Sequence, residues 1–490
     1  MRRRPSILDL VHDDFEACWR AAASRDRRFD GRFFIGVHST RIYCRPICPA
    51  PPAKRENVRF YPTAAAAEAA GLRACRRCRP ETAPGTPEWL GGSATVARGL
   101  RLITDGYLDR RTVPELAHEL CVGERQLRRL FLEHLGAPPH SVARQRRLQL
   151  ARLLIDQTSL PMIDVAAASG FSSLRRFNAS VRSAFGRSPT ELRKSARPRP
   201  NGVVALRLPY RPPLAWEPLL AFLAARAIPG VEEVRAEAYR RTVPTAVGGA
   251  VVEVTPVAGT AELAVRLELP SVTVLRGLVS SVRAAFDLDA DPLAIHDSLG
   301  SLGESTPGLR VPGTLDPFEL AVRAVLGQQV SVQAARTLAG RLVQRFGEPL
   351  AEPSGALTHL FPAPAAVHSA PLESIGLPGA RAETIRRLAR AVDEEGLELS
   401  QTSSPDGVRA QLSAIPGIGP WTVEYVAMRA LRDPDAFPAG DLGLRQALAT
   451  NGRPAAAREV EERSAAWRPW RAYAAVQLWD SLAAPDRVAA

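Results

Sequence analysis

The spacing of apolar and polar residues divides the chain into stretches of different predicted secondary structure. From Thr95 to Lys194, apolar residues recur at spacings of three and four, which is the period of amphipathic helices. From Val203 to about Asp287 the pattern alternates as in strands, for example in Ala250-Val251-Val252-Glu253-Val254, with helices between. From Pro292 onward the pattern is helical again, whereas residues 1–85 mix helix with short strands.

Two proline-containing stretches separate these regions. The stretch Pro80–Pro87 reads Pro-Glu-Thr-Ala-Pro-Gly-Thr-Pro, and Arg197–Gly202 reads Arg-Pro-Arg-Pro-Asn-Gly. Such compositions are typical of linkers, because proline cannot donate a backbone hydrogen bond within a helix or sheet. A chain of 490 residues is also long enough for several domains, each burying its own core.

Charge favours a polyanionic partner. The 64 Lys and Arg residues outnumber the 51 Asp and Glu residues, giving a net charge of +13. Lysine occurs only at Lys54 and Lys194, so arginine supplies almost all of the positive charge. With no apolar run long enough to span a bilayer, we expect a soluble, cytoplasmic protein without membrane contact.

Four of the six cysteines form two close pairs, Cys44 with Cys48 and Cys75 with Cys78. Two close pairs of thiolates are the ligand set of a tetrahedral structural zinc site, so the pattern predicts one bound Zn²⁺. The alternative is two disulfides in a secreted module. The polar, charged sequence after Met1 disfavours it, because it lacks the features of a signal peptide.

The pattern Tyr43-Cys44-Arg45-Pro46-Ile47-Cys48 followed by Cys75-Arg76-Arg77-Cys78 resembles the zinc module of the Ada family of alkylation-damage sensors. Asp13-Asp14, Phe33–Val37 and Arg55–Tyr61 extend the resemblance. It implies that Cys44 is both zinc ligand and methyl acceptor, taking the methyl group of a DNA methylphosphotriester. A zinc-bound thiolate stays deprotonated at neutral pH and needs no neighbouring base. The transfer would occur once per molecule.

A helix–turn–helix pattern occurs twice between Thr95 and Lys194. The first copy contains Thr112–Ala117, a turn at Cys121–Gly123 and a second helix from Glu124 to Leu135; Thr112 is the predicted N-cap. The second copy contains Ile163–Phe171 and then Ser172–Phe185. We expect Cys121 to be a small buried side chain in its turn.

The second copy resembles the signature of AraC-type regulators, through Gly170–Ser173, Phe177, Phe185-Gly186 and Pro189. The resemblance implies recognition helices at Glu124–Leu132 and Ser173–Val181. These carry the arginine pairs Arg128-Arg129 and Arg175-Arg176, which could read guanine or hold phosphate. The alternative is a generic helical bundle with solvated arginines.

The segment Leu412–Thr422 contains Pro416-Gly417-Ile418-Gly419-Pro420 and reads as a helix-hairpin-helix. Gly417 and Gly419 would let backbone amides approach a DNA phosphate. Together with Phe437-Pro438-Ala439-Gly440-Asp441, the segment resembles the helix-hairpin-helix glycosylase superfamily, which implies that Asp441 is catalytic. The alternative role for Asp441 is a helix cap.

Further stretches resemble bacterial 3-methyladenine-DNA glycosylase II, so that the likeness covers nearly all of residues 203–485. They are Trp216–Arg226, Pro307–Gly313, Ala324–Val332 and Trp470–Ala474. The resemblance implies a base pocket lined by Phe222, Trp421, Tyr425 and Trp479, where ring faces attract a cationic alkylated purine. Each aromatic residue could instead be core packing, and for Phe222 the two interpretations are evenly balanced.

This sequence departs from those families at two points, Gln329 and a missing cysteine motif, and it also differs from the strand-nicking relatives of the glycosylase. Gln329 stands where the glycosylase usually has an apolar wedge, so the apolar part of its stacking is lost. Related glycosylases that also nick the strand form a Schiff base through a lysine beside the hairpin, whereas Trp421 stands there in this sequence and residues 203–490 contain no lysine. The resemblance therefore implies a monofunctional glycosylase that leaves an abasic site. The Pro-Cys-His-Arg motif of full-length Ada proteins is absent, so we expect no repair of O6-alkylguanine.

The predicted fold is multidomain and mainly α with α+β parts. It comprises an Ada-like zinc-binding α/β module (1–85), an all-α AraC-type domain with two helix-turn-helix units (95–194), an α/β glycosylase N-terminal domain (203–287) and an all-α helix-hairpin-helix glycosylase domain (288–490).

The predicted function combines methyl transfer to Cys44 that activates transcription with hydrolytic excision of alkylated bases such as 3-methyladenine. Double-stranded DNA and RNA polymerase are the expected partners of a bacterial, nucleoid-associated monomer. Two alternatives remain. One is a zinc-dependent regulator whose glycosylase half is inactive, and the other is a repair enzyme whose first half only targets it to DNA.

Overall fold

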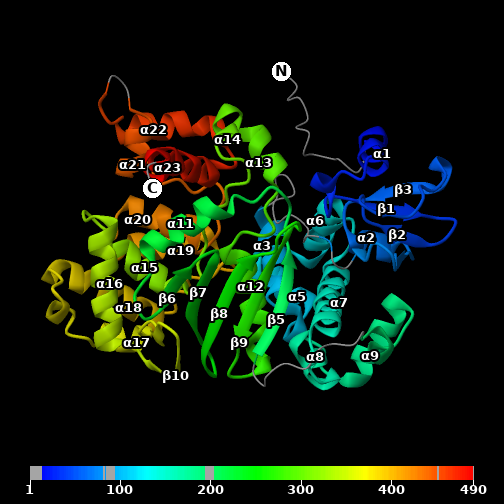
Figure 1. Cartoon of the computed structure of the whole chain (residues 1–490), viewed down its shortest axis with the longest axis horizontal. Helices are drawn as coiled ribbons and strands as arrows, with labels where there is room; N and C mark the ends of the chain where they lie inside the picture. Colours follow the sequence, from blue (N-terminus) through cyan, green and yellow to red (C-terminus); the bar gives the residue numbers. More distant parts are fainter. Residues whose placement is uncertain (1–13, 81–82, 84–93, 194–202, 450–451, 489–490) are drawn as a thin grey trace.

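A computed structural model describes residues 14–80, 83, 94–193, 203–449 and 452–488 (Figure 1). The predicted linker at 197–202, and most of the one at 80–87, lie outside the described residues, as do Asp13 and Lys194. Among the described helices, none combines the length and apolar character needed to cross a bilayer.

The first module is a small sheet with helices beside it. Its strand order is β3-β1-β2-β4; β1 is antiparallel to β2 and β3, whereas β2 and β4 are parallel. Asp14 caps the first helix and Thr63 the second. The elements are α1 (Phe15–Ala23), β1 (Phe34–Val37), β2 (Ile42–Cys44), β3 (Val58–Tyr61), α2 (Ala64–Ala69) and β4 (Arg73–Ala74).

The next domain is all helical and contains two similar units joined by one long helix, α7. Thr112 forms a capping box with Glu115, as its position predicts. Both second helices of the units end at a left-handed glycine, Gly136 and Gly186, each with φ of 67°. The helices are α3 (Ala94–Thr104), α4 (Tyr107–Arg110), α5 (Val113–Glu119), α6 (Glu124–Leu135), α7 (Pro139–Gln157), α8 (Met162–Ala168), α9 (Leu174–Phe185) and α10 (Pro189–Leu192).

A five-stranded antiparallel sheet follows, with strand order β5-β9-β8-β7-β6. Alternate residues of β5 and β9 are buried, which explains the alternating sequence pattern. The elements are β5 (Val203–Pro209), α11 (Trp216–Arg226), β6 (Glu232–Arg235), β7 (Ala238–Thr245), β8 (Gly248–Pro256), β9 (Glu262–Glu268) and α12 (Leu275–Ala285).

The remaining chain packs helices around the largest apolar cluster of the molecule. A two-stranded hairpin, β10 (Pro349–Ser354) with β11 (Leu357–His359), departs from the all-helical expectation. The helices are α13 (Pro292–Leu299), α14 (Ser301–Glu304), α15 (Pro317–Leu326), α16 (Val332–Phe346), α17 (Pro364–His368), α18 (Gly379–Asp393), α19 (Pro405–Ser413), α20 (Pro420–Arg429), α21 (Leu442–Ala447), α22 (Ala457–Ser464) and α23 (Arg471–Val488).

The helical domain and the five-stranded sheet share one continuous apolar cluster. Phe177 and Val181 of α9 belong to the same cluster as Val204 and Leu206 of β5. In addition, α7 contacts β5, and α8 contacts the 3-10 turn at Val272–Val274. The second helix-turn-helix unit therefore completes its core with residues of the following domain. Figure 1 shows α7 and α8 beside β5.

Polar contacts reinforce this junction. Arg276 of α12 forms an ion pair with Asp109 of α4. Helix α3 also contacts the C-terminal helical domain. Arg98 Nε donates to the carbonyl of Thr402 at 2.8 Å, and Arg101 Nε donates to the carbonyl of Gln401 at 2.7 Å. Helix α3 therefore holds the segment that leads into α19, the first helix of the predicted helix-hairpin-helix.

Candidate metal centre and candidate active site

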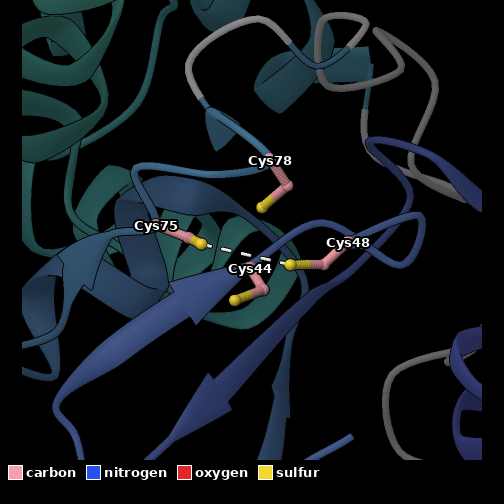
Figure 2. A group of neighbouring side chains, drawn as sticks. All are labelled: Cys44, Cys48, Cys75 and Cys78. Carbon is pink, nitrogen blue, oxygen red and sulfur yellow. Dashed lines mark hydrogen bonds between the residues drawn. The ribbon is translucent and has the colours of Figure 1, made fainter. Parts of the chain in front are cut away.

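The four paired cysteines converge on one point of the first module (Figure 2). Cys44 ends β2 and Cys75 directly follows β4, and the parallel pairing of these strands brings the two together. The four Sγ atoms lie within 4.8 Å of one another, and the Cys48 and Cys75 sulfurs are 4.0 Å apart. All four side chains are buried, with exposed fractions of 7–9%.

The electrostatics of this cluster fit a divalent cation. The hydrogen bond to Cys48, reinforced by burial, raises the pKa of Cys44, while hydrogen bonds from Cys44 and Cys78 lower the pKa of Cys48. Packed this closely, the four thiols compete with one another for negative charge. A divalent ion bound by all four would remove that competition, and four sulfur donors form the set that zinc prefers. The cluster is a site for one Zn²⁺.

Cys44 also lines a groove of about 1180 Å³ on the module's surface. Lys54, Arg76 and Arg77 line the same groove, and both arginines are exposed. Arg45 does not add to this charge, because its guanidinium is paired with Asp30 and its Nε donates to that carboxylate at 2.8 Å. The groove is therefore basic beside a sulfur that is only slightly exposed.

The four predicted DNA-binding arginines lie exposed on the second helices of the two units, Arg128 and Arg129 on α6, Arg175 and Arg176 on α9. Within the described ranges, none of them forms an ion pair with a carboxylate. The opposite faces of these helices are buried through residues such as Phe131 and Phe177. The expectation that Cys121 is buried was wrong: it is exposed in its turn, with φ of 55°.

The predicted hairpin lies between α19 and α20. Gly417 has φ of 93°, and a Cβ there would lie 2.0 Å from Thr384 Oγ1, so only glycine fits. Gly419 precedes α20, with open space where a Cβ would be, so the N-terminus of α20 is unobstructed. Gln328 Nε2 donates to the Gly417 carbonyl and to Thr422 Oγ1, both at 3.0 Å.

Gln329 lies in the loop between α15 and α16 and is exposed, with a left-handed backbone of φ 56°. Its neighbours Val330 and Ser331 line the cavity described next, whereas Gln329 itself does not. Gln329 therefore projects at the rim.

Asp441 caps a helix, and its carboxylate also lines the cavity described next. Its Oδ1 accepts from Leu444 N at 3.1 Å, so it is the N-cap of α21. The same oxygen accepts from Trp479 Nε1 at 2.9 Å, and Oδ2 accepts from Trp421 Nε1 at 2.8 Å. Three N–H donors therefore fix the carboxylate in one orientation at a wall of the cavity.

A cavity of about 370 Å³ brings together Asp441 and the four predicted aromatic residues, although they come from four parts of the chain: α11, α20, the start of α21 and α23. Trp421 and Tyr425 stack with ring centroids 5.0 Å apart and an interplanar angle of 16°, and Tyr425 lies 6.3 Å from Trp479. Phe222 reaches the cavity from α11. The Arg226 guanidinium lies 3.7 Å from the centre of its ring and covers one face.

The sequence analysis did not predict the four arginines that also line this cavity, Arg226, Arg323, Arg336 and Arg429. A helical signal could have found two of them, because Arg226 follows Phe222 by one helical turn and Arg429 follows Tyr425 likewise. Arg429 lies beneath the aromatic rings and donates through Nη1 to the Tyr425 hydroxyl.

Comparison with known families gives matches along most of the chain. Residues 17–81 match the metal binding domain of Ada and 116–195 a helix-turn-helix domain. Residues 205–316 match the AlkA N-terminal domain, and 322–472 match the HhH-GPD superfamily base excision DNA repair protein.

Individual relatives agree with these matches. DNA-3-methyladenine glycosylase 2 of Escherichia coli is 35% identical over 275 residues, which are 56% of this chain and 95% of that protein. The structure of a 3-methyladenine DNA-glycosylase from Archaeoglobus fulgidus aligns with a TM-score of 0.50 and 25% identity, covering 56% of this chain and 97% of that one.

One relative spans nearly the whole molecule: the probable bifunctional transcriptional activator/DNA repair enzyme AlkA of Mycobacterium tuberculosis is 48% identical over 488 residues, covering 97% of this chain and 98% of that protein. This chain therefore belongs to the family of AlkA-type bifunctional transcriptional activators and DNA repair enzymes, with an Ada-type zinc module at its start.

Proposed function

We propose that the chain couples a single-use sensor of DNA methylation damage to a glycosylase that excises alkylated bases such as 3-methyladenine. The observation that carries the repair half is Asp441, oriented by two indole N–H groups at the wall of an aromatic cavity. The proposal assigns methyl acceptance to residues 1–85, DNA binding to 95–194 and excision to 203–490.

In the glycosylase step, the bond between sugar C1′ and the base nitrogen breaks, and its electron pair leaves with the base. The sugar becomes electron-poor, and the Asp441 carboxylate stabilises that charge across the cavity. A base already made cationic by alkylation leaves as a neutral molecule, so strong general acid catalysis is unnecessary. Water adds to C1′ and releases a proton, which completes hydrolysis.

The proposed enzyme leaves an abasic site and does not cleave the strand. Schiff-base chemistry requires an amine, and the chain contains lysine only at Lys54 and Lys194, both outside the glycosylase half. We expect borohydride to trap no covalent adduct with lesion DNA. A trapped species would contradict this part of the proposal.

In the sensor step, Cys44 Sγ attacks the methyl carbon of a methylphosphotriester. A sulfur–carbon bond forms, the carbon–oxygen bond breaks, and the phosphodiester leaves with the electron pair. When bound, zinc would keep the sulfur as a thiolate at neutral pH. The groove beside Cys44 supports this step, because Lys54, Arg76 and Arg77 could hold the DNA backbone.

The activator half would bind an operator through Arg128, Arg129, Arg175 and Arg176, with Gln329, Gly417 and Gly419 contacting lesion DNA in the repair half. We further propose that the protein acts as a monomer in the bacterial cytoplasm, at the nucleoid, and contacts RNA polymerase. The ordered cavity around Asp441 argues against a decayed, merely DNA-binding second half.

One experiment tests both halves. Full-length, zinc-loaded protein is incubated with methylated DNA, and mass spectrometry follows the released bases and the mass of the peptide containing Cys44. We expect free 3-methyladenine and one added methyl group per molecule. Base release without methylated Cys44 would leave only a repair enzyme, and the reverse would leave only a sensor.

A further inference from the structure

The cavity that holds Asp441 carries more positive charge than its aromatic walls suggest. Asp441 is its only carboxylate among the described lining residues, against Arg226, Arg323, Arg336 and Arg429. Arg323 is compensated, because its Nη1 lies 2.8 Å from carboxylate oxygens of both Glu232 and Glu319. The other three make no ion pair within the described part of the chain.

The uncompensated arginines are held by neutral groups. Arg336 Nε donates to the Ala227 carbonyl at 2.7 Å. Arg429 is almost fully buried and donates to the carbonyls of Pro312 and Gly313 at 2.6 and 3.1 Å, and to Tyr425. Its hydrogen-bonding capacity is therefore largely used.

Arg226 differs from Arg429 because much of its capacity remains available to a ligand. Its Nη1 donates to the Phe222 carbonyl at 3.2 Å, and its guanidinium also interacts with the Tyr425 hydroxyl. It is partly exposed and lines the cavity, so N–H groups remain for a base. Burial would raise the pKa of Tyr425, but Arg429 and Arg226 outweigh burial and lower it, as expected for a hydroxyl beside guanidinium groups.

A positive field affects charged and uncharged lesions in opposite ways. A cationic alkylated purine is repelled by Arg226, in a half-buried cavity where charge interactions are weakly screened. An uncharged modified purine acquires negative charge as the electron pair of the C1′–N bond passes to it. A fixed guanidinium donor stabilises that developing charge.

We propose that Arg226 is a specificity-determining residue that shifts excision toward uncharged modified purines and away from cationic alkylated ones. The inference rests on the proposed glycosylase function. In the step it favours, the C1′–N bond breaks, the base departs as an anion bound by Arg226, and water adds to C1′. The proton released by the water neutralises the base, so that free base and abasic DNA result.

The test uses full-length protein and two duplexes that differ only in the lesion, a single hypoxanthine (uncharged) or a single 7-methylguanine (cationic). Single-turnover rates of base release are compared for wild type, Arg226→Met, which keeps bulk but removes charge, and Arg226→Lys, which keeps charge. Arg345→Met is the matched control, because Arg345 is an exposed arginine on α16 away from the cavity.

We expect Arg226→Met to lower hypoxanthine release about tenfold or more, while 7-methylguanine release is unchanged or faster. The rate of hypoxanthine release by Arg226→Lys should lie between those of wild type and Arg226→Met. Arg345→Met should release both bases at the wild-type rates. Equal loss for both lesions would show a packing role through Phe222 and overturn the inference, as would an unchanged ratio of rates. If wild type released neither base, the proposed glycosylase function itself would fail.

Discussion

The residues of the zinc site and those of the base cavity are held in position in different ways. The four cysteines lie close together in the sequence, in a module whose apolar clusters are small. Asp441 and its aromatic partners come from α11, α20, α21 and α23, which pack on or beside the largest cluster of the molecule. In the first region, strand pairing brings two of the ligands near one another and a bound ion would hold all four together. In the second, packing fixes the site beforehand.

The two sites should therefore respond differently to substitution of their residues. Loss of a zinc ligand should remove structure, because the module has little apolar burial to replace it. Loss of a group in the base cavity should remove chemistry and leave the fold, because the surrounding helices are held by residues elsewhere.

The largest expected effect is the loss of a zinc ligand. Cys48→Ala should reduce bound zinc from one per molecule to none and abolish methyl transfer, because three thiolates no longer complete the tetrahedral set. Base release should be retained. Zinc content and methyl transfer are measured beside Cys121→Ala, an exposed cysteine outside the cluster. Retained zinc and methyl transfer in Cys48→Ala would refute the four-cysteine site.

The second prediction concerns the base cavity. Asp441→Asn should slow release of 3-methyladenine about a hundredfold or more, because the carboxylate charge is lost. Asparagine also caps helices well, so the midpoint of thermal unfolding should change little. Methyl transfer to Cys44 should be unaffected. Near-normal base release would remove Asp441 from catalysis and leave it only its capping role.

A smaller effect should connect the zinc site to DNA affinity. Four thiolates around Zn²⁺ carry a formal charge near −2, which opposes phosphate binding by Arg76 and Arg77. Methylation of Cys44 removes one negative charge, worth about 2 kcal/mol for a charge pair roughly 7 Å apart at an effective dielectric of about 20. Operator affinity should therefore rise about tenfold, most visibly at low salt. Equal affinities of both forms at every salt concentration would eliminate this electrostatic switch.

The smallest predicted effect is at the rim of the cavity. Gln329→Leu should bind abasic product DNA a few-fold more tightly, because an apolar side chain fills the gap in the base stack better than an amide. Product affinity is measured by competition, with Gln344→Leu, an exposed glutamine on α16, as the control. Weaker binding by Gln329→Leu would contradict this prediction. It would show that a polar contact of the amide with DNA contributes more to affinity than apolar filling of the gap.

Much of this architecture could be predicted because its signals are local. The cysteine pairs, the capping box at Thr112 and the alternation along β5 each depend on neighbours in the chain. The arginines of the base cavity were not predicted, because arginine is abundant in this chain and its usual location is the solvated surface.

Nor could the sequence reveal the cluster shared by the second helix-turn-helix unit and the sheet. The apolar faces of α7–α9 and of β5 are each evident from their periodicity, but a pattern does not say which surface covers which. The prediction that Cys121 is buried was wrong for a related reason. A small apolar side chain in a turn has no periodic neighbours that would indicate whether it points into the core.

The shared cluster has a consequence for how such a two-part protein can be taken apart. Phe177 and Val181 on one side, and Val204 and Leu206 on the other, are buried in the same cluster. If either half were produced alone, apolar surface would be uncovered, which favours aggregation. A gene that lost one half would therefore need new polar residues on α7–α9 or on β5 before the remaining half could survive as an independent protein.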